Sequence, residues 1–240
     1  LPIYPGKGVV EKVLPRMNKL IRPAVANIDG MFIVMAAAAP NPNRFLIDQM
    51  LMTCEYGGIH PSLCFNKCDL DRETAAEYAA FYRCCGYEVF LVSAMTGKGL
   101  AAVRERLSGK VTAFGGPSGV GKSSLLTRIV GKKLTVGAVS DKIGRGRHTT
   151  RHSEIMKLDE KTYVVDTPGF SALDFSHLKA HEILPLMPDL ATHAGRCRFS
   201  SCVHRFEPDC SVKEALTAGK ILPERYETYC KVTDSIQERK

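Results

Sequence analysis

The sequence Gly-Pro-Ser-Gly-Val-Gly-Lys-Ser at residues 116–123 matches the phosphate-loop pattern G-x-x-x-x-G-K-[ST]. An apolar run typical of a strand, Val111–Phe114, precedes it, and a helical pattern over Lys122–Val130 follows it. This context disfavours a chance glycine turn, because backbone N–H groups and a helix N-terminus would then surround phosphate oxygens. Lys122 would act catalytically on the β- and γ-phosphates. The expected phosphate-binding residues are Gly115, Gly116, Pro117, Ser118, Gly119, Val120, Gly121, Lys122, Ser123 and Ser124.

Two short motifs after other predicted strands point to guanine as the base. Asn66-Lys67-Cys68-Asp69, of the form N-K-x-D, follows the strand Ser62–Phe65. The Asp69 carboxylate can accept hydrogen bonds from N1–H and the exocyclic amine of guanine, whereas adenine would leave it unpaired. Ser93-Ala94, after the strand Glu88–Val92, matches a second guanine-loop pattern. We expect GTP and GDP as ligands, with the base contacted by Asn66, Lys67, Cys68, Asp69, Ser93 and Ala94.

A fourth motif indicates a magnesium and γ-phosphate site. Asp166-Thr167-Pro168-Gly169 follows the strand Thr162–Val165. The Asp166 carboxylate suits the magnesium side of such a site, and the Gly169 N–H suits a γ-phosphate contact. A basic stretch, 144–151, lies between the phosphate loop and this motif. A threonine in it can complete the magnesium shell in the triphosphate state; the alternative is a mobile basic loop, and the two interpretations are compatible. The expected Mg²⁺ ligands are Ser123 and either Thr149 or Thr150. The two threonines are also candidate catalytic residues.

The order of these motifs is permuted. In Ras-like GTPases the phosphate loop comes first and the guanine motifs last, whereas here 66–69 and 93–94 precede 116–123. The same site can form if the chain is circularly permuted. Strands alternate with helical patterns through this region, which predicts an α/β fold with a mostly parallel sheet covered on both faces. Asn43 and Asp71 are the predicted N-caps of two of the helices.

The C-terminal region contains a compact set of metal-ligand residues. Cys197, Cys202, His204 and Cys210 lie within fourteen residues of one another. Three thiolates and one imidazole suit four-coordinate Zn²⁺, and a fully ligated site is structural rather than catalytic. A disulfide or reduced core cysteines are the alternatives. The chain has nine cysteines in all. Five of the others fall on apolar faces or beside the guanine loop, and we interpret them as small hydrophobic residues: Cys54, Cys64, Cys68, Cys84 and Cys85.

The permuted motif order, the Gly-Arg-His-Thr-Thr sequence at 146–150 and the cysteine cluster together resemble the ribosome small-subunit-dependent GTPase family of the RsgA/YjeQ type. The resemblance implies an N-terminal OB barrel, a circularly permuted GTPase domain and a C-terminal helical zinc domain. We therefore expect residues 1–22 to be a remnant of the barrel, 23–175 the GTPase domain and 176–240 the zinc-binding domain. The resemblance also implies a GTP hydrolase that acts in late maturation of the small (30S) ribosomal subunit. The subunit would stimulate hydrolysis, and the protein would bind its 16S rRNA.

The four motifs do not include a residue that would position the attacking water. Ras-like enzymes often place a glutamine after the motif glycine to orient this water, whereas this chain has Phe170 there. Slow intrinsic hydrolysis follows. His148 is the candidate catalytic residue within the chain, because an imidazole can orient water or accept a proton near neutral pH. The alternatives are a group supplied by the partner, or a role for His148 in RNA binding or loop structure.

Charge and hydropathy bear on the partner. The net charge is +8, and basic residues gather near the N-terminus, in 141–152 and around the zinc ligands, which favours contact with an RNA backbone. The longest apolar run, Met31–Ala39, is too short to span a membrane. We expect a cytoplasmic, monomeric protein without a membrane partner. Two other functions stay open: a GTP-dependent RNA-binding switch with negligible turnover, and a permuted GTPase acting on another RNA or on membranes.

Overall fold

A six-stranded sheet forms the centre of the computed structural model, which describes residues 12, 15–131, 153–167 and 175–237. The strands lie in the order β5-β4-β3-β6-β8-β7. All neighbouring pairs are parallel except β7–β8, which is antiparallel at one edge. The predicted mostly parallel α/β sheet is therefore confirmed. The strands are β3 (Gly30–Ala36), β4 (Pro61–Asn66), β5 (Glu88–Leu91), β6 (Val111–Gly115), β7 (Glu154–Lys157) and β8 (Tyr163–Asp166).

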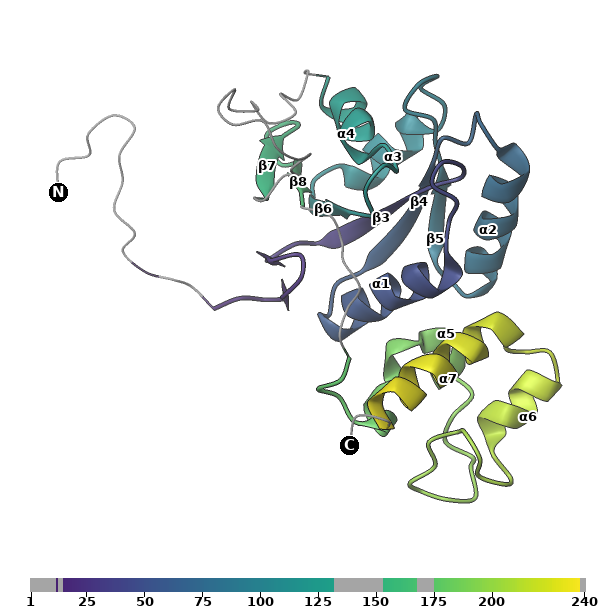
Figure 1. The fold of residues 1–240 in the computed structure, drawn as a ribbon. Helices are drawn as coiled ribbons and strands as arrows, with labels where there is room; N and C mark the ends of the chain where they lie inside the picture. The colour runs from purple at the N-terminus through teal and green to yellow at the C-terminus, as the bar shows by residue number, and fades with distance from the viewer. Residues whose placement is uncertain (1–11, 13–14, 132–152, 168–174, 238–240) are drawn as a thin grey trace, which may run out of the picture.

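Strand β3 is apolar along its whole length because both of its faces are covered. Met31, Ile33 and Met35 enter one core, which is shared with helices α1 and α2. Phe32 and Val34 enter a second core with α3 and α4. Figure 1 shows the sheet between these two pairs of helices. Burial on both faces is typical of parallel strands and explains why β3 lacks the polar alternation of a half-exposed strand.

The helices begin where the capping residues predict. Asn43 Oδ1 accepts a hydrogen bond from Leu46 N at 3.0 Å, and Asp71 Oδ1 accepts one from Thr74 N at 2.9 Å. These side chains satisfy N–H groups that have no partner within the helix. Both predicted N-caps are thus confirmed. The helices that the described residues form around the sheet are α1 (Arg44–Tyr56), α2 (Arg72–Cys84), α3 (Leu100–Leu107) and α4 (Lys122–Val130).

A short hairpin precedes the sheet. Strands β1 (Lys19–Leu20) and β2 (Val25–Ala26) pair antiparallel, and Leu20 packs into the core beneath α1. Of the residues expected to be a barrel remnant, 1–22, only Lys12 and 15–22 are among those described. The barrel assignment and the two domain boundaries remain predictions.

The C-terminal region is a helical unit with its own core. It contains two 3₁₀ turns and helices α5, α6 and α7, which Figure 1 shows gathered beside α1. Its core includes Met52 of α1, so the unit packs directly on the sheet domain. The turns are Ala180–Glu182 and Leu184–Leu186, and the helices are α5 (Pro188–Ala191), α6 (Ser211–Thr217) and α7 (Pro223–Gln237).

A buried ion-pair network joins this unit to α1. The Arg225 side chain of α7 is fully buried, and its Nη1 lies 2.7 Å from Oδ1 of Asp48 on α1. Its Nη2 lies 2.7 Å from Oδ1 of Asp189 on α5. Thr228 and Tyr82 donate further hydrogen bonds to Asp48, at 2.7 and 2.9 Å. Burial raises the pKa of Asp48, and the nearby Arg225 guanidinium offsets only part of this effect.

We predict that Arg225→Ala lowers the free energy of unfolding by about 3 kcal/mol, because it leaves a buried carboxylate without its charged partner. Urea denaturation followed by circular dichroism measures this. The matched control is Lys231→Ala on the same helix, which breaks an exposed pair with Glu227 and should cost less than about 0.5 kcal/mol. Equal losses for the two variants would contradict the prediction.

Candidate nucleotide and metal sites

The four nucleotide motifs meet at one edge of the sheet. Asn66 ends β4, Ser93 follows β5, Gly115 ends β6 and Asp166 ends β8. These strands are parallel, so their carboxyl ends lie on the same side, where ligands bind in open α/β sheets. The permuted order along the chain therefore still brings the motifs together in space.

Two glycines of the phosphate loop are required by their surroundings. Gly121 has φ +83°, and a Cβ there would lie 2.5 Å from Nδ2 of Asn66. A Cβ on Gly116 would overlap the carbonyl oxygen of Val34. Helix α4 begins immediately afterwards at Lys122, so its N-terminus faces the loop and favours anions. Ser123 and Ser124 are exposed in the first helical turn.

Lys122 points toward the end of β8. Its Nζ lies 2.8 Å from Oδ1 of Asp166 and also donates a hydrogen bond to the carbonyl oxygen of Thr167. Both side chains of the ion pair are mostly buried, with 13% and 15% exposed. The predicted phosphate lysine and the predicted magnesium-side carboxylate are therefore neighbours across 44 residues of sequence.

Asn66 ties three of the loops together. Its Nδ2 donates to the carbonyl oxygen of Val120 in the phosphate loop at 3.0 Å, and its Oδ1 accepts from the N–H of Ala94 at 3.0 Å. The side chain is 1% exposed, and buried hydrogen bonds of this kind are costly to break. The N-K-x-D loop, the Ser-Ala loop and the phosphate loop are thus held in fixed relative positions.

The rest of the N-K-x-D loop is partly exposed. Lys67 has φ +61°, and its Nζ donates to the carbonyl oxygen of Gly119 at 2.8 Å. Cys68 is buried and its N–H bonds to the carbonyl oxygen of Val92 at 3.1 Å. The Asp69 carboxylate is exposed at the same edge. An exposed carboxylate can accept hydrogen bonds from an incoming base.

Some candidate residues lie outside the described part of the chain. These are His148, Thr149, Thr150 and Gly169. In the other direction, motif reading missed Arg128 on α4, whose guanidinium contacts the Ser93-Ala94 loop. A single arginine within a helix belongs to no recognisable motif, so the sequence carries no signal for it.

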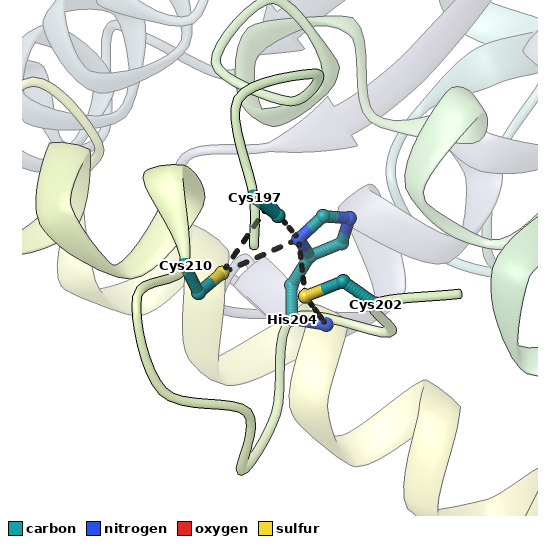
Figure 2. A group of neighbouring side chains, drawn as sticks. All are labelled: Cys197, Cys202, His204 and Cys210. Atoms are coloured by element: carbon teal, nitrogen blue, oxygen red, sulfur yellow. Dashed lines mark hydrogen bonds between the residues drawn. The ribbon is translucent and has the colours of Figure 1, made fainter. Parts of the chain in front are cut away.

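The four predicted zinc ligands form one cluster, which Figure 2 shows around the imidazole of His204. Nδ1 of His204 lies 3.4, 3.4 and 3.3 Å from Sγ of Cys197, Cys202 and Cys210. The Sγ atoms of Cys197 and Cys210 are 3.9 Å apart. Tetrahedral Zn²⁺ with usual bond lengths places such ligand atoms about 3.6–3.8 Å from one another. The donor set and its spacing therefore fit a four-coordinate zinc ion.

Surrounding groups hold the ligands in place and shift the pKa values of three of them, in different directions. The Tyr226 hydroxyl donates to the backbone carbonyl oxygen of His204 at 2.7 Å. Burial opposes ionisation of Cys197, but its contacts with the side chain and the N–H of Ser211 hold the pKa of its thiol below the usual value. Burial also lowers the pKa of His204. The shifts at Cys197 and His204 favour the forms that bind metal, a thiolate and a neutral imidazole. At Cys202 burial acts the other way and raises the pKa of the thiol to about 12.

The remaining cysteines follow our interpretation with one exception. Cys54, Cys64 and Cys68 are buried and Cys85 is partly buried, as expected of small hydrophobic residues. Burial raises the pKa of the Cys54 and Cys64 thiols. Cys84 is exposed at the end of α2, so its assignment to an apolar face was wrong. It lies on the solvent side of the helix, next to the buried side on which Tyr82 packs.

Comparison with known proteins identifies close relatives. A family described as RsgA GTPase matches residues 13–176. A small ribosomal subunit biogenesis GTPase RsgA from Clostridium kluyveri is 42% identical over 236 residues, which cover 98% of this chain and 82% of that protein. The protein of the same name from Moorella thermoacetica is 43% identical over 95% of this chain and 79% of its own length.

Solved structures agree with these matches. YjeQ from Thermotoga maritima superimposes with a TM-score of 0.82 at 35% identity and covers 98% of this chain and 81% of its own. YloQ, described as a circularly permuted GTPase, has a TM-score of 0.78 at 33% identity, and the match covers 95% of this chain and 75% of that one.

Among the described residues, no helix is both long and apolar enough to cross a membrane.

Proposed function

Since this chain belongs to the RsgA GTPase family, we propose that it hydrolyses GTP to GDP and phosphate during maturation of the small ribosomal subunit. Its relatives are named for biogenesis of that subunit. The observation that best supports the proposal is the tie that Asn66 makes between the guanine and phosphate loops at one sheet edge. The family membership makes the chain an enzyme of the GTPase class.

We assign the nucleotide contacts to this chain's own groups. The Asp69 carboxylate accepts hydrogen bonds from the guanine edge, and the phosphate-loop N–H groups surround the phosphate oxygens. Lys122 moves from Asp166 to the β- and γ-phosphates when nucleotide binds, which leaves Asp166 for the magnesium side. Ser123, with Thr149 or Thr150, would hold Mg²⁺, which neutralises charge on the phosphates when bound. His148 or a group of the ribosomal partner would orient the attacking water.

A single structural zinc ion is the second part of the proposal. Cys197, Cys202, His204 and Cys210 would hold it, and the fit of their ligand atoms to a tetrahedron supports this. With four protein ligands the ion has no open position, so its role is to stabilise the loop between α5 and α6. It would take no part in hydrolysis.

Contact with 16S rRNA is assigned to basic surfaces. Arg16, Lys19 and Arg22 are exposed and line a groove of about 1010 Å³ with the ring of Tyr56. Exposed arginines beside an aromatic ring suit an RNA strand. The surface around the zinc ligands offers less positive charge to RNA than its sequence indicates, because Arg205 is paired with Asp234.

We propose that the protein is a monomer and that it acts in the cytoplasm, where such subunits mature. We also propose that its domains span residues 23–175 and 176–240.

GTP turnover with and without purified small subunits tests the proposed function. We expect stimulation on the order of 10²-fold or more, because the chain lacks the usual water-orienting glutamine. Association with subunits should weaken steeply as salt is raised, since phosphate contacts dominate. Nucleotide-dependent binding without turnover would instead favour an RNA-binding switch. Turnover that subunits do not change would favour action on another RNA.

A further inference from the structure

Arg128 on α4 connects the phosphate helix to the loop that follows β5. Its Nε donates to the carbonyl oxygen of Ala94 at 2.9 Å, and its Nη2 donates to that of Met95 at 2.8 Å. Arg128 lies six residues after Lys122, about 9 Å along the helix axis. One helix therefore contacts the phosphate site at its first turn and the Ser-Ala loop near its last.

The backbone of Ala94 is consequently held from two sides. Its N–H donates to Oδ1 of Asn66 at 3.0 Å, while its carbonyl accepts from Arg128. The backbone carbonyl of Arg128 in turn accepts from Arg104 on α3, the helix that follows the loop. Charge-assisted bonds to neighbouring carbonyls fix a peptide more firmly than neutral ones do.

We propose that Arg128 is a positioning residue for guanine recognition, acting by fixing the backbone of Ala94 and Met95 relative to the phosphate loop. The inference rests on the proposed function and on the contact between Ser93-Ala94 and the base that the sequence predicts. Arg128 would not touch the nucleotide. Its contribution is to hold the base pocket at a set distance from the phosphate site, so that binding does not have to order the loop.

The forked shape of the guanidinium explains why an arginine, rather than a lysine, suits position 128. Two carbonyl oxygens accept from two different N–H groups of one planar side chain. A lysine at 128 has a single nitrogen on a flexible stem, so both carbonyl oxygens would have to share that one atom and would be held less firmly than by the planar fork. Arg128 is also exposed at the surface, so its removal leaves no cavity in the core.

The experiment compares Arg128→Ala and Arg128→Lys with the wild-type chain. GDP and ADP affinities are measured by competition with a fluorescent GDP analogue, and kcat is measured at saturating GTP. We expect Arg128→Ala to weaken GDP binding about 10-fold, or about 1.4 kcal/mol, mainly through faster release. ADP affinity and kcat should stay within about 2-fold, and Arg128→Lys should be intermediate. Arg106→Ala is the matched control, since Arg106 on α3 pairs with Glu88 instead.

Two results would overturn the inference: unchanged GDP affinity in Arg128→Ala, or an equal loss of GDP and ADP affinity, which would indicate a general effect on the fold. Failure of the proposed function has a different signature. In that case the wild-type chain itself would show no preference for GDP over ADP, and Asp69→Asn would change nothing.

Discussion

Lys122→Ala should reduce kcat/KM for GTP on the order of 10³-fold. A positioned cation at a transferring phosphoryl group is among the largest single contributions in such sites. In the structure the Lys122 ammonium lies beside the Asp166 carboxylate, and 13% of the Lys122 side chain is exposed. Alanine removes this charge where negative charge develops on the phosphate oxygens. Steady-state phosphate release at several GTP concentrations measures the effect.

The control for this variant must separate lost chemistry from lost folding, because Asp166 is left without its partner. Lys157→Ala on β7 removes an exposed lysine outside the four motif loops and should leave turnover within about 2-fold. Thermal melts of both variants should show folded protein at the assay temperature. Turnover of folded Lys122→Ala within ten-fold of the wild type would exclude Lys122 from the phosphate site.

Removal of zinc should unfold the loop and helices around Cys197–Cys210 while the sheet domain stays folded. Zinc binding by small cysteine–histidine units supplies about 10–16 kcal/mol near neutral pH, more than a loop of this size gains from packing. We expect one equivalent of zinc in the purified chain. After chelation, hydrogen–deuterium exchange should lose protection over 193–217 and keep it over β3 and β4.

Two cysteine variants sharpen this test. Cys210→Ser replaces a buried ligand and should reproduce the effect of chelation, whereas Cys84→Ser replaces an exposed thiol on α2 and should change neither zinc content nor exchange. GDP affinity should survive in both, because the nucleotide loops lie on the sheet. Full protection of 193–217 in zinc-free protein would contradict a structural role for the metal.

Prediction from sequence succeeded where the signal is local. The apolar run of β3, the caps at Asn43 and Asp71 and the spacing of the four zinc ligands all depend on residues close together in the chain. It was less accurate for the last helices. From sequence alone, the pattern in this region predicts helical pieces over Ala215–Gly219 and Arg225–Gln237, whereas in the structure α6 begins at Ser211 and α7 at Pro223.

The sequence by itself determined which chemistry the chain can offer: a phosphate loop, guanine-reading groups and a zinc-binding set. Only the tertiary structure decided how these parts are fixed to one another. Asn66 reaches the phosphate loop 54 residues away, and Arg225 reaches Asp48 across 177 residues. Residue type even argued against the second pair, since arginine is rarely buried. Motifs depend on neighbouring residues, whereas the burial of a charge depends on a partner that only folding brings into contact.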